Sequence, residues 1–143
     1  MEPDGLFVYG TLREGGAHHG WLKRTNPIGR TRAYAPGRLF HLPDAGFPAM
    51  TQGSIPESLP PGFGWVVGEF VGYEDGEDLD AALKNLDQME GVVEGLFERQ
   101  VVPVLLEGGQ SYAAWTYVFP VDRQPRLERE AVELVDGAWS PYL

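Results

Sequence analysis

The stretch "LFVYGTLREGG" at 6–16 is an apolar run that stops at a glycine and continues into a polar turn. Its aromatic and β-branched residues predict a strand over 6–11. Gly10 has no Cβ, so the chain can turn sharply there and leave neighbouring N–H groups open to a ligand. Such donors suit a carboxylate or a developing oxyanion, and Thr11 adds a hydroxyl. A tight turn that only ends a strand accounts for Gly10, but it leaves Tyr9 and Thr11 unexplained.

Further strand-like segments and a few helical ones predict the fold class. β-branched and aromatic residues recur near 29–41, 65–73, 97–106 and 111–119. The sequence "EGGQ" at 107–110 is typical of a hairpin turn between the last two. The proline-rich stretch 42–64 predicts a long irregular connection, either a binding lid or a variable surface insertion. Together these features indicate one α+β domain over 1–143, with a curved or closed sheet flanked by helices.

Two helices are expected. The first covers 78–91, with Asp78 as its N-cap and Gly91 as its C-terminal stop. The second is weaker and runs from about Pro125 to Val135.

Glu90 lies in the apolar stripe of the first helix. At 3.6 residues per turn it falls within about 20–40° of the leucines at 79, 83 and 86, whereas Asp80, Lys84 and Gln88 face water. Burial of an ionised carboxylate is costly, so such a residue usually has a partner, a raised pKa or a function. The alternative is that the helix ends before residue 90 and Glu90 bends into solvent. Asp87, at the edge of the stripe, is expected to cap a loop or pair with an arginine.

Composition excludes several classes of protein. The net charge of −10 argues against nucleic acid as a partner. There is no apolar run of membrane-spanning length, the N-terminus is acidic where a signal peptide would be basic, and there are no cysteines. A cytoplasmic protein without membrane attachment is therefore expected. His18, His19 and His41 lack metal-ligand spacing, and phosphate-loop and dinucleotide motifs are missing, so we expect neither a metal nor a cofactor.

Two stretches taken together resemble the γ-glutamyl cyclotransferase-like family, which includes γ-glutamylamine cyclotransferases and AIG2-like proteins. They are "LFVYGTLREGG" and "LDQMEGVVEGLFERQVVPV" at 86–104, which carry the family's F-x-Y-G-T-L and L-D-x-x-E-G patterns. "GRLFHLPDAGFPAM", "GEFV" and "AWTYVF" follow in the family's order. Phe97 departs from the usual tyrosine and Ala138 from the aspartate of a C-terminal G-D-W, so a hydroxyl and a capping carboxylate are lost.

The resemblance implies a small mixed β-barrel with flanking helices and an enzyme that needs no cofactor. A small-molecule γ-glutamyl substrate closes on itself to give 5-oxoproline and expels an amine or amino acid. Glu90 takes the general acid/base role, and the turn formed by Tyr9, Gly10, Thr11 and Leu12 binds the glutamyl group through its backbone. Tyr117 is expected to point its hydroxyl toward that group or to pack as a core aromatic.

Two other functions stay open at this point. A non-catalytic small-molecule binding or interaction module on the same fold is the first, although a scaffold would gain stability from leucine at position 90. The second is a hydrolase in which Glu90 activates water and produces glutamate. Product identity separates these possibilities. The leaving amine and the oligomeric state are not set by the sequence.

Overall fold

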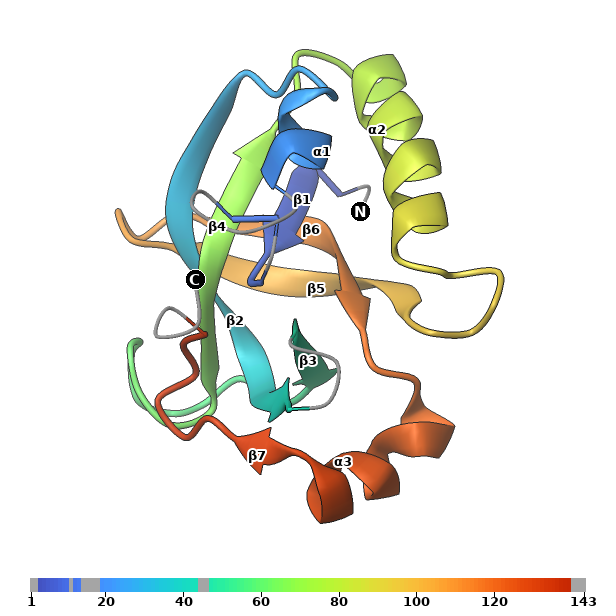
Figure 1. The fold of residues 1–143 in the computed structure, drawn as a ribbon. Coiled ribbons are helices and arrows are strands. Elements are labelled where there is room, and N and C mark those ends of the chain that lie inside the picture. Colours follow the sequence, from blue (N-terminus) through green and yellow to red (C-terminus); the bar gives the residue numbers. More distant parts are fainter. Residues whose placement is uncertain (1–2, 11, 14–18, 44–46, 140–143) are drawn as a thin grey trace.

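The computed structural model describes residues 3–10, 12–13, 19–43 and 47–139. Five strands close into a mixed barrel in the order β2-β4-β1-β6-β5, and β5 pairs with β2 to complete the circle (Figure 1). β1 runs parallel to β6, and the other barrel pairs are antiparallel. The barrel strands are β1 (Gly5–Val8), β2 (Gly29–Leu42), β4 (Trp65–Gly72), β5 (Glu98–Leu106) and β6 (Ser111–Val118). The five predicted strands, the hairpin at 107–110 and the barrel with flanking helices are thereby confirmed.

The long strand β2 belongs to two sheets. Its first part pairs with β4 and β5, whereas its end pairs with β3 (Phe47–Gln52) and β7 (Val132–Glu133) below the barrel (Figure 1). The expectation of an irregular connection throughout 42–64 is therefore wrong for β3. The segment "FPAMTQ" becomes a strand because the second half of β2 offers it a complete pairing edge, from Leu42 with Phe47 to Gly37 with Gln52.

In the described part of the chain three α-helices flank the barrel, and their limits differ from the expected ones. α2 (Gly76–Met89) stands beside the barrel (Figure 1). The short α1 (His19–Lys23), which the sequence pattern did not predict, lies near the first half of α2. The N-cap is Asp75, whose side chain accepts a hydrogen bond from the Asp78 backbone N–H at 2.9 Å, so the assignment of Asp78 as the cap is wrong. Gly91 has φ of +68° and ends the helix as predicted.

The C-terminal part of the chain also departs from expectation. α3 (Gln124–Glu130), preceded by the short 3-10 helix η1 (Val121–Arg123), covers only the first half of the predicted helix 125–135. The chain then becomes extended and forms β7 against β2. None of the helices in the described part of the chain has the length and apolar character of a bilayer-spanning segment.

Two apolar cores share the wall formed by β1. Because successive side chains of a strand point to opposite faces, Phe7 and Tyr9 enter the barrel whereas Leu6 and Val8 face outward. The inner core contains residues from all five barrel strands. The outer core forms where the buried leucines of α2 pack on the barrel wall. Residues on β1 therefore connect the interior of the barrel with the surface that faces α2.

Candidate active site

A cavity of about 210 Å³ opens between the end of β1, the start of β3, β6 and the C-terminal end of α2. Its wall is mostly apolar and includes Phe7, Leu12, Met89 and Leu96. Glu90 is the charged side chain among the described residues that line it. A carboxylate in an apolar hollow is the arrangement that the helical pattern of the sequence suggested.

The cavity lies next to a short parallel pairing of β1 and β6. The ladder joins Gly5 with Ala114 and Leu6 with Trp115. Further along, the Thr116 hydroxyl donates to the Phe7 carbonyl at 2.8 Å. The ends of both strands line the cavity.

The Tyr9 hydroxyl joins three strands. It donates to the Tyr117 carbonyl of β6 and accepts a hydrogen bond from the Met50 N–H of β3 at 3.2 Å. Burial, with the nearby Glu90 charge adding to it, raises the pKa of Tyr9 far above its usual value, so the hydroxyl keeps its proton. The hydroxyl has only one proton to donate, and the Tyr117 carbonyl already accepts it. A contribution of Tyr9 to ligand binding is therefore expected from its backbone.

The turn after β1 is closed by a hydrogen bond from the Arg13 N–H to the Gly10 carbonyl at 3.0 Å. A Cβ on Gly10 would lie 2.6 Å from Cγ of Pro48, so the close approach of β3 requires glycine here. Leu12 is buried in the outer core and also lines the cavity. Thr11 lies outside the described residues. The predicted binding turn thus borders the cavity through Tyr9, Gly10 and Leu12.

Glu90 follows directly on the last residue of α2. Its N–H donates to the Leu86 carbonyl at 2.8 Å and its φ and ψ of −81° and −3° are helical, so the helical path continues to this residue. The side chain is half-buried and lines the cavity, which rules out the alternative in which it bends freely into solvent. Burial raises the pKa of Glu90 from 4.5 to about 7. Such a carboxyl can both accept and return a proton near neutral pH.

One turn before Glu90, Asp87 has charged and polar partners. Its Oδ1 accepts a hydrogen bond from the Tyr117 hydroxyl at 2.7 Å and pairs with Nε of Arg99 at 3.2 Å. The pairing of Asp87 with an arginine is confirmed. Tyr117 lines the cavity from β6, and its hydroxyl belongs to the network with Asp87.

Several lining residues were not predicted as site residues. Thr116 precedes Tyr117 in the alternation of β6, and Pro48 lies in the segment expected to be irregular. Phe97 packs edge-to-face on Phe119, with ring centroids 6.3 Å apart, and presents an apolar wall where the resembling family has a hydroxyl. Ala138 is the second position where the chain departs from the family pattern. Its N–H donates to Oδ1 of Asp136 at 3.2 Å, so a carboxylate two residues earlier caps this turn.

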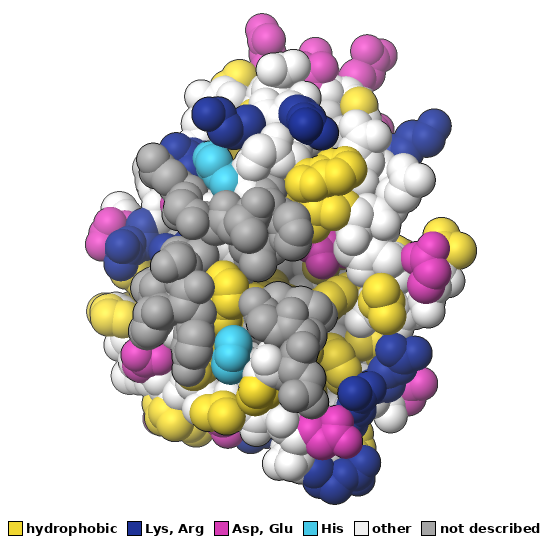
Figure 2. All heavy atoms as spheres, viewed as in Figure 1, with side chains coloured by type: hydrophobic (Ala, Val, Ile, Leu, Met, Phe, Trp, Pro, Cys, Tyr) yellow, Lys and Arg dark blue, Asp and Glu magenta, His cyan; other side chains and the backbone are white. Residues whose placement is uncertain are grey.

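Charge is distributed unevenly over the surface around this fold. Figure 2 shows acidic side chains gathered at the top of the view, over the beginning of α2, where the first turn contains Glu77 and Asp78. Lysine and arginine side chains lie at other edges of the same face, and several of them are close to acidic ones over α3 (Figure 2).

Comparison with known proteins identifies the family of this chain. The fold and cavity define a small mixed barrel with one helix-end carboxyl in an apolar hollow. Residues 6–141 match the family described as gamma-glutamyl cyclotransferase, AIG2-like, and the chain belongs to this family. It is 34% identical, over 122 residues, to a gamma-L-glutamyl-butirosin B gamma-glutamyl cyclotransferase from Niallia circulans; the match covers 82% of this chain and 67% of that protein.

Two solved structures are similar in fold. An AIG2-like protein from Mus musculus matches with a TM-score of 0.65 and 19% identity, over 97% of this chain and 89% of that one. YkqA from Bacillus subtilis matches with a TM-score of 0.64 and 23% identity over 99% of this chain. This chain spans only 41% of the length of YkqA.

Proposed function

We propose that the protein converts the γ-glutamyl group of a γ-glutamylamine, or of a γ-glutamyl amino acid or peptide, into 5-oxoproline and releases the amine. The observation that carries this proposal is Glu90, a carboxyl with a pKa of about 7 in an apolar cavity beside the turn after β1. Membership of the γ-glutamyl cyclotransferase family supports the reaction class.

In the proposed reaction the substrate supplies both the nucleophile and the electrophile. Glu90, ionised, takes a proton from the substrate's α-ammonium group, and the freed amine attacks the γ-carbonyl carbon to form the five-membered ring. The bond from that carbon to the leaving nitrogen then breaks. Glu90 returns its proton to this nitrogen, and the ring nitrogen, which bears two hydrogens after the attack, loses one of them to the released amine, so the amine leaves as an ammonium ion and the carboxylate is restored. No electron or external co-reactant is needed.

The protein's contribution has three parts. A positioned acid/base group typically supplies about 10²–10⁴-fold in rate. Holding the flexible glutamyl chain in a curled conformation removes much of the entropy cost of ring closure. The backbone N–H groups of the turn after β1, which includes Gly10, are the proposed donors to the α-carboxylate or to the oxyanion of the tetrahedral intermediate.

The identity of the leaving amine is the finer question. The relative from Niallia circulans is named for γ-L-glutamyl-butirosin B, and we include this compound among the candidate substrates. The cavity here is about 210 Å³, a size that suits a glutamyl group, with the remainder of a larger amine outside. We therefore propose that recognition is centred on the glutamyl half of the substrate.

A panel of γ-glutamyl compounds tests the proposal. It should include a simple γ-glutamyl alkylamine, γ-glutamyl-lysine, a γ-glutamyl amino acid, a γ-glutamyl peptide and a γ-glutamylated aminoglycoside, with products identified by mass spectrometry. We expect 5-oxoproline and free amine in equal amounts. Glutamate as the product would instead identify a hydrolase, and the absence of any product across the panel would favour the non-catalytic binding module.

A further inference from the structure

Tyr117 lines the cavity, and the charge of Glu90 is close enough to its hydroxyl to add to the rise of its pKa. The Tyr117 hydroxyl donates to Oδ1 of Asp87 at 2.7 Å. The same carboxylate oxygen lies 3.2 Å from Nε of Arg99. Arg99 is the register partner of Tyr117 across β5 and β6, so these two side chains are held by paired strands, and Asp87 reaches them from α2.

The direction of the hydrogen bond follows from the chemistry of the three groups. Arg99 can only donate, and a carboxylate paired with it can only accept. The single proton of the Tyr117 hydroxyl must therefore point to Asp87. Burial, with the bond to Asp87 adding to it, raises the pKa of Tyr117 far above its usual value, so the proton stays in place. The remaining lone pairs of the tyrosine oxygen can only accept a hydrogen bond from a ligand.

This polarity selects which part of a γ-glutamyl substrate can lie beside Tyr117. The α-carboxylate has no proton to donate, and it would be repelled by the Glu90 carboxylate that lines the same cavity. The α-amino group donates hydrogen bonds and must approach Glu90 to lose its proton.

We propose that Asp87 and Arg99 are positioning residues that hold the Tyr117 hydroxyl as a hydrogen-bond acceptor for the α-amino group of the substrate. The inference rests on the proposed function. It orients the substrate across the cavity, with the amine toward Tyr117 and Glu90 and the α-carboxylate toward the turn after β1. The Arg99 guanidinium also lies over the ring of Trp115, 4.5 Å from the ring centroid, and this contact restricts the movement of the arginine side chain.

Ligand binding to an inactive enzyme tests this orientation directly. In the Glu90→Gln background, calorimetry would compare a γ-glutamylamine that the wild type converts with its glutaryl counterpart, which is identical except that it lacks the α-amine. We expect Tyr117→Phe and Asp87→Asn each to weaken binding of the amine-bearing ligand about tenfold, as for loss of one charge-assisted hydrogen bond. Binding of the glutaryl compound should not change.

The path through Tyr117 is tested by combining variants. If Asp87 acts through Tyr117, the double variant Tyr117→Phe with Asp87→Asn binds the amine-bearing ligand no more weakly than Tyr117→Phe alone. Arg99→Lys should keep most of the affinity because it keeps the charge, and Arg99→Met should behave like Asp87→Asn. Asp80→Asn is the matched control, since Asp80 is an exposed acid on the same helix.

The outcomes separate this inference from the function on which it rests. Equal weakening of both ligands, additive effects in the double variant, or a loss of thermal stability with unchanged affinity would overturn the positioning role. If the wild type makes 5-oxoproline but Tyr117→Phe binds the amine-bearing ligand as tightly as before, only this inference fails. If the wild type makes no 5-oxoproline from any γ-glutamyl compound, both fail.

Discussion

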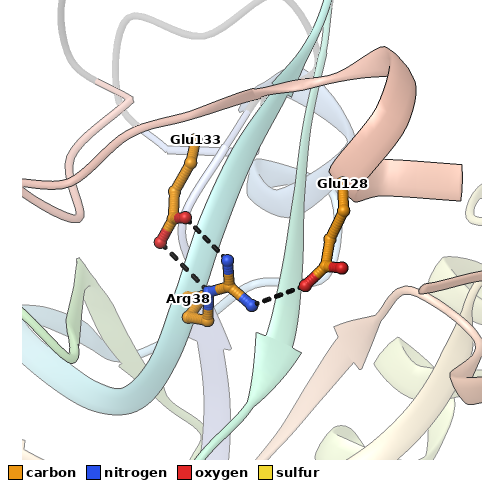
Figure 3. A network of polar contacts seen from close by, with 3 residues as sticks. All are labelled: Arg38, Glu128 and Glu133. Carbon is orange, nitrogen blue, oxygen red and sulfur yellow. Dashed lines mark hydrogen bonds and ion pairs between the residues drawn. The ribbon is translucent and has the colours of Figure 1, made fainter. Parts of the chain in front are cut away.

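Two regions of the molecule bring acidic and basic side chains together, and their environments differ. At the lower edge of the fold, Arg38 of β2 reaches Glu133 of β7 at 2.7 Å and Glu128 of α3 at 3.2 Å (Figure 3). At the cavity, Asp87 of α2 pairs with Arg99 at 3.2 Å. The side chains of Arg38, Glu128 and Glu133 are 45%, 63% and 28% exposed, and those of Asp87 and Arg99 are 26% and 30% exposed.

The comparison shows how pairing and burial change the pKa of an acidic side chain in opposite directions. We call Arg38, Glu128 and Glu133 the lower network. Both of its acids face the Arg38 guanidinium, and the hydrogen bond from Arg38 lowers the pKa of Glu133. Such a network joins β2 to β7 and α3, but water screens its charges and reduces its contribution to stability. At the cavity, Asp87 has its arginine, but Glu90 one turn later faces an apolar wall and its pKa is raised. The paired acid suits a structural task and the desolvated acid suits proton transfer.

The largest expected effect comes from removing the desolvated acid. Glu90→Gln should lower turnover at least about a hundredfold while the protein stays folded, because the amide cannot accept the ammonium proton. Turnover would be measured by 5-oxoproline formation and folding by circular dichroism. Asp87→Asn should cost much less. Near-normal turnover in folded Glu90→Gln, or an equal loss in Asp87→Asn, would show that the wrong carboxylate had been assigned.

The next effect tests the turn after β1, which also borders the cavity. Gly10→Val adds a branched side chain where Pro48 approaches and where the substrate is proposed to bind, so turnover should collapse even in the protein that folds. Thr11→Ala removes one hydroxyl and no backbone N–H, and should cost only about 1 kcal/mol in kcat/KM. Comparable losses in the two variants, normalised to the folded fraction, would contradict recognition by the backbone of this turn.

Stability gives a third test, with the sign fixed by the raised pKa of Glu90. A folded-state pKa of about 7 against 4.5 means that the wild type loses stability as pH rises from about 4.5 through 7. Gln does not titrate, so Glu90→Gln should unfold at a temperature several degrees above the wild type at pH 8, reflecting up to roughly 3 kcal/mol. The difference should close at pH 4. A Tm difference that is independent of pH would contradict desolvation of this carboxyl.

The same shift sets the pH dependence of catalysis. The acidic limb of kcat/KM should have an apparent pKa near 7, with activity rising as Glu90 ionises. A limb near 4.5, the ordinary value for a glutamate, would mean that Glu90 is solvated in the free enzyme. The profile would be recorded with a substrate whose amine does not titrate between pH 5 and 8.

The smallest effect should come from the lower network. Arg38→Met removes the ion pairs shown in Figure 3 but keeps most of the aliphatic stem, and should cost less than about 1 kcal/mol of stability. Thermal unfolding at low and high salt would show the difference shrinking as salt screens the wild-type pairs. Turnover should be unchanged. A loss of activity would show that this edge communicates with the cavity.

Sequence patterns predicted the barrel strands because each has its own periodicity and turn signals. They failed at β3, whose residues pair with the distant half of β2, and such pairing leaves little local signal. They misplaced the N-cap of α2 because two aspartates, Asp75 and Asp78, lie at the start of the helix, and only the folded backbone decides between them. Local pattern therefore predicts element type better than element boundaries.

Some residues of the candidate site could be predicted from the local sequence, and others could not. Glu90 was found because a carboxylate in an apolar helical stripe is visible at the local level, and the family resemblance pointed to the same residue. The hydrogen bonds of Tyr9 were not visible, because its hydroxyl bonds to Met50 and Tyr117, which are far away in the chain. Pro48 was missed for the same reason, since it reaches the cavity only after β3 pairs with β2.

The bonds made by the Tyr9 hydroxyl also bear on how the protein is made. They span 41 residues to Met50 and 108 residues to Tyr117. During synthesis, a chain that has not yet reached β6 cannot complete the wall of the cavity, whatever local structure its first half has formed. Contacts of such large sequence separation are slow to form. The nascent chain should thus remain catalytically inert until most of it has left the ribosome, and activity should appear together with closure of the barrel.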